Sequence, residues 1–346
     1  MNNSDLSIKL QTNKHLKEVC TFGIGGPAKF YVEVHSIEEV QEALIYCNNN
    51  QLPYFILGKG SNCLFDDKGF PGVVIHNKID FKMELSKGIF HVGAGYSFSL
   101  LGSQTAREGW AGLEFASGIP ATVGGAVYMN AGANGKEKYE FLTSVDFLDE
   151  KGRFHTFQKE NLSFSYRTSP FQRMKGCIVG ATFTLQPSYE ARKKQLDIIS
   201  YRINTQPYSE KSAGCIFRNP QSNHAGALID KLGLKGYKIG GAEVSEMHAN
   251  FIVNTENASA KDVLELIAHI KQHVKSHTEI ELETEVRYIP YQQFPLDNRS
   301  TATLQRADLL DRDEFIAITM NEERYKRGTS IIRPSIDHPA EIADPL

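Results

Sequence analysis

Three polar side chains in separate parts of the chain could carry out chemistry. Cys215 stands among small residues, where its thiol could be a nucleophile, a proton donor or only a filler of the core. Arg167 precedes a Pro turn, and its guanidinium could bind a carboxylate through two parallel hydrogen bonds or lie in solvent as a surface charge. Glu285 lies in a segment that alternates acidic and apolar residues, which also suits a solvated row of charges. The residues alone leave these alternatives open.

Two glycine-rich segments could bind phosphate groups. Leu57–Asn62 (LGKGSN) follows an apolar run, so its backbone N–H groups, the Ser61 hydroxyl and the Asn62 amide could point at an anion. Its spacing fits neither a Walker A loop nor a dinucleotide fingerprint, and it could be a simple turn. Ser117–Ala133 (SGIPATVGGAVYMNAGA) is less generic, although a packing seam of small residues has the same composition. Two such loops in one chain favour a dinucleotide cofactor.

A histidine stripe is the only pattern that suggests metal. His269, His273 and His277 repeat at intervals of four and share one face of a predicted helix. No HExxH motif or carboxylate pattern accompanies them, so we interpret the stripe as a polar helix flank and expect no metal.

The elements that must position these residues form three regions. Alternating strands and helices over about residues 15–80 include a helix opened by a capping box at Ser36–Glu39. Residues 85–188 are rich in predicted strands, and a helical connector, Ala191–Asn204, leads to the third region. There we expect a helix capped by Ser259 and a strand of period two from Ile280 to Arg287. Residues 290–346 are punctuated by proline, and only Leu309–Met320 suggests a helix.

Composition limits the classes of function. The chain has 346 residues, 41% of them hydrophobic, and a net charge of −3, which fits a globular protein of two to three domains without a basic surface for nucleic acid. Five cysteines at irregular spacings favour reduced thiols in the cytoplasm. The sequence contains no signal peptide and no apolar run long enough to span a membrane, so we expect no membrane partner.

In their fixed order, these motifs resemble the UDP-N-acetylenolpyruvoylglucosamine reductase family, also called UDP-N-acetylmuramate dehydrogenases. The resemblance covers about residues 15–290 and adds Tyr166–Phe171 (YRTSPF), Ser212–Pro220 (SAGCIFRNP), His248–Asn254 (HANFIVN) and Leu282–Arg287 (LETEVR) to the two loops. The absence of a long insertion near YRTSPF is similar to the shorter second type of the family.

The resemblance implies an α+β fold of three domains. Residues 15–82 and 83–200 would form a FAD-binding fold of the vanillyl-alcohol-oxidase type, 201–288 an α+β substrate-binding domain, and 289–346 a C-terminal extension of unknown role. It also implies noncovalent FAD, NADPH as co-substrate, UDP-N-acetylglucosamine enolpyruvate as substrate, a place in peptidoglycan synthesis and, on our expectation, a monomer.

Residue roles follow from the same resemblance. Arg167 would clamp the substrate carboxylate, Glu285 would stabilise the enol and Cys215 would donate a proton. The FAD-binding residues would be Gly58, Lys59, Gly60, Ser61, Asn62, Ser117, Ile119, Pro120, Thr122, Gly124, Gly125 and Ala126, with the two loops holding the pyrophosphate through backbone N–H groups. The substrate-binding residues would be Tyr166, Arg218, Asn219, His248 and Asn250.

Position 215 holds Cys, whereas the more usual residue of the family at this position is Ser. We interpret Cys215 as a functional substitution, because a thiol is a stronger acid than an alkyl alcohol. Three competing functions remain: a flavin oxidase of the same superfamily, a cysteine hydrolase with Cys215 as nucleophile and His248 as base, and a nucleotide-sugar binding protein without catalysis.

Overall fold

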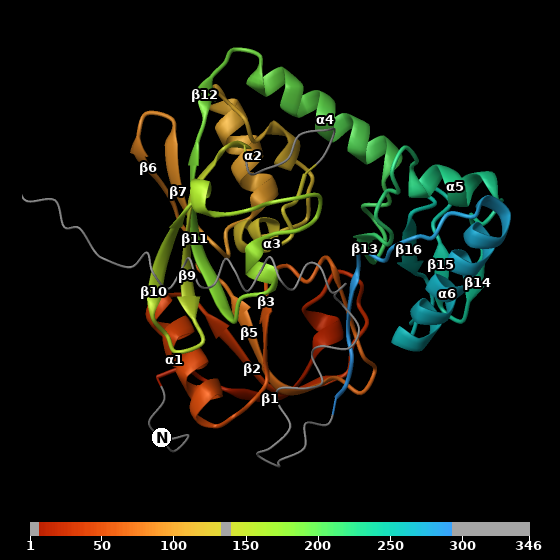
Figure 1. Cartoon of the computed structure of the whole chain (residues 1–346), viewed down its shortest axis with the longest axis horizontal. Helices are drawn as coiled ribbons and strands as arrows, with labels where there is room; N and C mark the ends of the chain where they lie inside the picture. Colours follow the sequence, from red (N-terminus) through yellow and green to blue (C-terminus); the bar gives the residue numbers. More distant parts are fainter. Residues whose placement is uncertain (1–6, 133–139, 293–346) are drawn as a thin grey trace, which may run out of the picture. The chain divides into compact units, whose positions relative to one another are not determined.

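The computed structural model describes residues 7–132 and 140–292, which belong to one compact unit (Figure 1). The predicted helix Leu309–Met320 and the last residue of the second glycine-rich segment, Ala133, lie outside the described residues. The proposed domain boundaries stay predictions.

The first sheet is mostly parallel and has the strand order β1-β2-β5-β3. Helix α1 joins β2 to β3 and packs its buried Val40 and Leu44 against Val73 and Ile75 of the sheet. Ser36 caps α1 as predicted, but the Glu39 carboxylate accepts from His35 N–H instead of Ser36 N–H, so the reciprocal half of the capping box is wrong. The bounds are β1 (Gln11–His15), β2 (Pro27–Val34), α1 (Ile37–Asn49), β3 (Tyr54–Leu57) and β5 (Phe70–Asn77).

The second sheet is antiparallel and has the order β10-β9-β11-β7-β6. Its helices share a core with the sheet, in which Phe98, Val123 and Val127 contact Val92, Val145 and Phe183. The bounds are β6 (Lys82–Ser86), β7 (Ile89–Gly93), α2 (Phe98–Arg107), α3 (Val123–Tyr128), β9 (Leu142–Asp149), β10 (Phe154–Gln158) and β11 (Gly176–Thr184). A short pair, β8 (Trp110–Ala111) and β12 (Gln186–Pro187), lies beside it.

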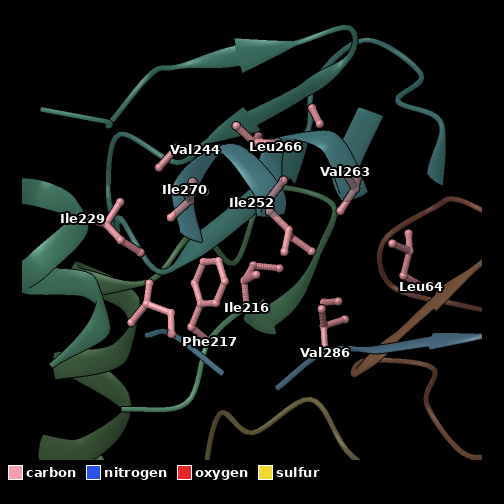
Figure 2. Packing of buried hydrophobic residues seen from close by; sticks show 14 of the residues in the cluster. Leu64, Ile216, Phe217, Ile229, Val244, Ile252, Val263, Leu266, Ile270 and Val286 are labelled. Carbon is pink, nitrogen blue, oxygen red and sulfur yellow. The ribbon is translucent and has the colours of Figure 1, made fainter. Parts of the chain in front are cut away.

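The third sheet follows the connector helix α4 (Ala191–Thr205) and is antiparallel, in the order β13-β16-β15-β14. Figure 2 shows Phe217 and Ile252 packed with Val263 and Ile270 of α6, which begins at the capping box of Ser259 as predicted. Leu64 of the first region joins this core, so the two regions share apolar contacts. The bounds are β13 (Ser212–Cys215), α5 (Ala225–Lys231), β14 (Lys238–Ile239), β15 (Ala242–Val244), β16 (Phe251–Asn254) and α6 (Ala260–Thr278).

The segment after α6 differs from its prediction. The expected strand Ile280–Arg287 is wrong: only β17 (Arg287–Ile289) is a strand, and it pairs in parallel with β4 (Cys63–Phe65) of the first region. Leu282 and Val286 are buried in the third core, and the bonds Arg218 N–H to Glu283 O and Glu285 N–H to Ile216 O hold the chain between them. These backbone hydrogen bonds, and not a continuous strand pairing, determine the course of this segment. The segment then returns to the first glycine-rich loop, where β17 pairs with β4.

Candidate active site

Arg167 lies in a tight turn between β10 and β11, where Ser165 and Thr168 form an isolated bridge. Its backbone adopts a φ of +55°, an uncommon conformation for a residue with a side chain and one that clusters at functional sites. The guanidinium is mostly buried, and its Nη1 donates to Gly132 O at 3.0 Å. Its Nε lies 2.7 Å from Glu285 Oε1, although this N–H has no well-aligned acceptor within residues 7–132 and 140–292. The contact is therefore an ion pair that leaves hydrogen-bonding capacity for a ligand.

Glu285 is the acidic partner of Arg167 and is not part of a solvated row. Only 11% of its side chain is exposed, whereas Glu283 two residues earlier is 74% exposed. Burial raises the pKa of Glu285, and the charges of Arg167 and then Arg218 act in the opposite direction. A protonated carboxyl is thus favoured here more than in water.

Cys215 ends β13 beside this pair. Burial raises the pKa of its thiol to about 12; the charge of Glu285 adds to the effect, and Arg167 opposes it. The three predicted catalytic residues therefore lie within electrostatic range of one another. A thiol that keeps its proton can act as an acid, whereas a nucleophilic cysteine needs a lowered pKa.

The predicted hydrolase pair does not form. His248 Nδ1 accepts a hydrogen bond from Asn250 N–H at 3.2 Å, its ring packs against Phe251, and within residues 7–132 and 140–292 it forms no hydrogen bond with Cys215. Burial also lowers the pKa of His248. This arrangement lacks the base that a cysteine nucleophile requires.

The first glycine-rich loop lies directly beside the reactive residues. Gly58 packs so closely on Thr122 of the second loop that a Cβ atom would lie 2.5 Å from Thr122 Oγ1. Asn62 Nδ2 donates to Glu285 O at 3.4 Å, and its carbonyl accepts from Arg287 N–H. In the described parts of the chain, the N–H groups of Lys59, Gly60 and Ser61 have no acceptor. The loop therefore presents free backbone donors, as an anion site requires.

The second loop differs from its prediction in one respect. The N–H groups of Gly124, Gly125 and Ala126 bond to Ala94 O, Thr122 Oγ1 and Thr122 O, so they are not free for a pyrophosphate. These bonds are needed because α3 is a single short helix whose first turn must be satisfied locally. Ile119 N–H is likewise bonded, to Ala116 O just before the loop, and Pro120 is exposed. Ser117 Oγ, in contrast, is buried and has no hydrogen-bond partner in the described part of the chain, which an additional group would explain.

The predicted substrate residues fall into two groups. Tyr166, which lies on the guanidinium of Arg167, accepts from Asn219 N–H through its hydroxyl. The buried Arg218 Nε has no hydrogen-bond partner among the residues that the structure describes. These residues border the Arg167 and Glu285 pair. Asn250 is 3% exposed, and both ends of its amide bond to the backbone of Phe217. The amide of Asn250 thus holds the segment that follows β13 in place.

Sequence reasoning missed a group of residues that support Arg167 and Glu285. Arg287 and Tyr128 contact each other, while Gln172 bonds to the carbonyl of Arg167 and Asn130 to that of Ser165. The spacing of Arg287 from Glu285 could have indicated a shared face of an extended segment. No sequence pattern could have indicated Gln172, because it hydrogen-bonds to backbone carbonyls, which every residue has.

The histidine stripe is an aromatic stack on α6. Tyr237 stacks on His269, with ring centroids 4.4 Å apart, and His269 continues to His273 and His277. In the part of the chain that the structure describes, no group of three or more His, Cys, Asp or Glu side chains is arranged so that it could hold a metal ion, and no helix is long and apolar enough to cross a bilayer.

Comparison with known proteins decides the family. The chain is 63% identical over 281 residues to the UDP-N-acetylenolpyruvoylglucosamine reductase of Protochlamydia amoebophila, an alignment that covers 81% of this chain and 94% of that protein. The chain belongs to this reductase family. The Chlamydia muridarum reductase is 49% identical, with 82% of this chain and 95% of that protein covered.

Two family models match separate parts of the chain. Residues 28–158 match a FAD binding domain, and 206–289 match the C-terminal domain of UDP-N-acetylenolpyruvoylglucosamine reductase. The reductase structure from Thermus caldophilus is 38% identical, with a TM-score of 0.70, and covers 82% of this chain and 100% of that one. The α+β fold class is confirmed, and the protein is an FAD-dependent oxidoreductase.

Proposed function

We propose that the protein reduces UDP-N-acetylglucosamine enolpyruvate to UDP-N-acetylmuramate with electrons from NADPH, as a step of peptidoglycan synthesis. The observation that carries the proposal is the buried pair of Arg167 and Glu285 beside the thiol of Cys215, whose pKa is raised by burial. Reduction of the enolpyruvyl double bond adds a hydride to one carbon and a proton to the other. A carboxylate clamp and a neutral acid at one place suit this reaction.

The residues of the two glycine-rich loops fit FAD. Free N–H groups at Lys59, Gly60 and Ser61 would hold its pyrophosphate, and the unpartnered Ser117 hydroxyl would bond to the cofactor. Bound FAD supplies hydride transfer between the nicotinamide and the enolpyruvyl group. The close packing of Gly58 on Thr122 keeps both loops in one place, so the cofactor would find a preformed cradle.

Arg167 and Glu285 would bind the substrate carboxylate and stabilise the enolate. Negative charge grows on the carboxylate oxygens after hydride addition, and the Arg167 guanidinium offers fixed donors to them. Because burial favours the protonated form of Glu285, this carboxyl could donate a further hydrogen bond. The low exposure of both side chains excludes water and strengthens these interactions.

Cys215 would complete the reaction by giving its thiol proton to the enolate carbon. Its raised pKa keeps the proton in place until a strongly basic carbon is formed. Solvent would then return a proton to the sulfur. Arg218, Tyr166 and Asn219 would bind the nucleotide-sugar end, where the unpartnered Arg218 Nε offers a donor to phosphate.

An anaerobic titration tests this function. NADPH should bleach the flavin band of the yellow protein, and one equivalent of UDP-N-acetylglucosamine enolpyruvate should restore it. UDP-N-acetylglucosamine, which lacks the enolpyruvyl group, is the matched control and should leave the band bleached. Recovery with the control sugar, or no recovery with the enolpyruvyl sugar, would contradict the proposal.

We also place the enzyme in the cytoplasm. All five cysteines are unpaired, which suits a reducing compartment. A monomeric state stays a prediction, to be measured by sedimentation of the holoenzyme.

A further inference from the structure

Tyr128, the last residue of α3, contacts both chain segments that supply the Arg167 and Glu285 pair. Its backbone carbonyl faces the turn that carries Arg167, and its hydroxyl faces the segment that carries Glu285. Arg167 and Glu285 come from distant parts of the sequence, and neither lies in a helix. Other contacts must therefore fix the distance between the side chains of Arg167 and Glu285.

The carbonyl of Tyr128 anchors the Arg167 turn. Ser169 Oγ donates to it at 2.7 Å and Gln172 Nε2 at 2.9 Å, so two side chains satisfy one carbonyl at the end of the helix. Gln172 Nε2 also donates to Arg167 O at 3.0 Å. One amide group thus ties the backbone of Arg167, in its uncommon left-handed conformation, to the end of α3.

The hydroxyl of Tyr128 anchors the Glu285 segment. Arg287 Nη1 donates to this oxygen at 2.6 Å, and the guanidinium lies over the ring, 5.0 Å from its centroid. Arg287 N–H bonds to Asn62 O in the first glycine-rich loop. Because Arg287 follows Glu285 by two residues, this contact limits the path of the Glu285 backbone.

We propose that Tyr128 is a positioning residue of the reductase, which holds the Arg167 turn and the Glu285 segment in register so that the ion pair is preformed. The role rests on the proposed function of that pair. Tyr128 closes a circuit from its carbonyl through Gln172 and Arg167 to Glu285 and Arg287, then back to its hydroxyl. Fixing two groups in advance removes an entropy cost from the reaction.

Weakening these contacts should change the pKa of Glu285. The groups that face Glu285 are Arg167 and Arg218, which oppose the rise in its pKa, and the Cys215 thiol. If Arg167 withdraws, the pKa of Glu285 rises further, because the nearest positive charge is lost. In the pH profile of kcat, the ionisation of Glu285 should therefore move to higher pH. A generally weakened fold would not shift it in this direction.

The substitution Tyr128→Phe removes the hydroxyl but keeps the ring and the carbonyl. We expect kcat of the holoenzyme to fall about tenfold with an upward shift of the pH profile, while KM for the enolpyruvyl sugar changes less than about twofold. The matched control is Tyr288→Phe. Tyr288 follows Arg287 in β17, and its hydroxyl donates to Asp66 Oδ2 at 2.5 Å, a bond separate from those that hold the Arg167 and Glu285 pair. This control should keep the parental kcat. Equal losses in both variants, or a parental rate and pH profile in Tyr128→Phe, would overturn the proposal.

A second measurement separates this proposal from the proposed function. In a crystal structure of the Tyr128→Phe holoenzyme, the separation of Arg167 Nε and Glu285 Oε1, 2.7 Å here, should exceed the ion-pair limit of about 4 Å. An unchanged separation would refute positioning by Tyr128. If the parental enzyme fails to reduce the enolpyruvyl sugar, only the proposed function fails, because this separation is measured without turnover.

Discussion

Two Arg–Glu pairs lie at neighbouring positions of the same returning segment and differ in their surroundings. Arg167 and Glu285 are 2.7 Å apart with side chains 20% and 11% exposed, whereas Arg218 and Glu283 are 3.5 Å apart and 32% and 74% exposed. The residue types are identical. A buried pair experiences a low dielectric and strong coupling, while an exposed pair is screened by water. The difference teaches that the environment, and not the residue type, gives Glu285 its proposed chemical role.

The strongest test of this comparison is removal of each arginine. Arg167→Met should lower kcat/KM about 1,000-fold, mainly through kcat, because a buried donor to a developing charge is lost. Arg218→Met should instead raise KM for the enolpyruvyl sugar about tenfold with little change in kcat, because this residue is assigned to binding. Steady-state kinetics with both variants would contradict the comparison if their effects on kcat were the same.

Substitution of Cys215 tests the acid beside the buried pair. In Cys215→Ala, reoxidation of the reduced enzyme by the enolpyruvyl sugar should slow about 100-fold, because the enolate loses its proton donor. Bleaching by NADPH should keep its rate. The control Cys215→Ser restores a hydroxyl donor and should retain turnover. Stopped-flow traces that show parental reoxidation in the alanine variant would remove the proton-donor role.

The sequence predicted the elements better than the way they join. The helices beginning after Ser36 and Ser259 follow from capping residues and apolar periodicity, which are local signals. The alternation from Ile280 to Arg287 misled the prediction, because Leu282 and Val286 are buried while long-range backbone bonds hold the segment. A period of two cannot reveal bonds to distant segments.

The site shows the same limit. The sequence indicated Arg167, Cys215 and Glu285 as candidates, and the structure brings them together. It did not indicate that the N–H groups of Gly124 and Gly125 are already bonded, because glycine composition says only that the backbone is accessible. The sequence did not indicate Tyr128 as a site residue, because half of its contacts are made by its backbone carbonyl, which every residue has.

The smallest expected effect concerns the pH dependence of stability and compares the two glutamates directly. The folded protein raises the pKa of Glu285 above its ordinary value of 4.5, so the folded state holds this proton to higher pH than the unfolded chain. This bound proton stabilises the folded protein fully at pH values below the pKa of Glu285 in the unfolded chain. The stabilisation is lost as the pH rises through the pKa of Glu285 in the folded protein, and it amounts to about 1.4 kcal/mol for each pH unit between these two pKa values. In Glu285→Gln the side chain is neutral at every pH. The free energy of unfolding of this variant should therefore increase relative to that of the parent as the pH rises over this range. In Glu283→Gln the lost carboxylate stood largely in water in both states, so urea unfolding should keep the parental pH dependence. A parental pH dependence in Glu285→Gln would mean that burial does not distinguish the two carboxyl groups.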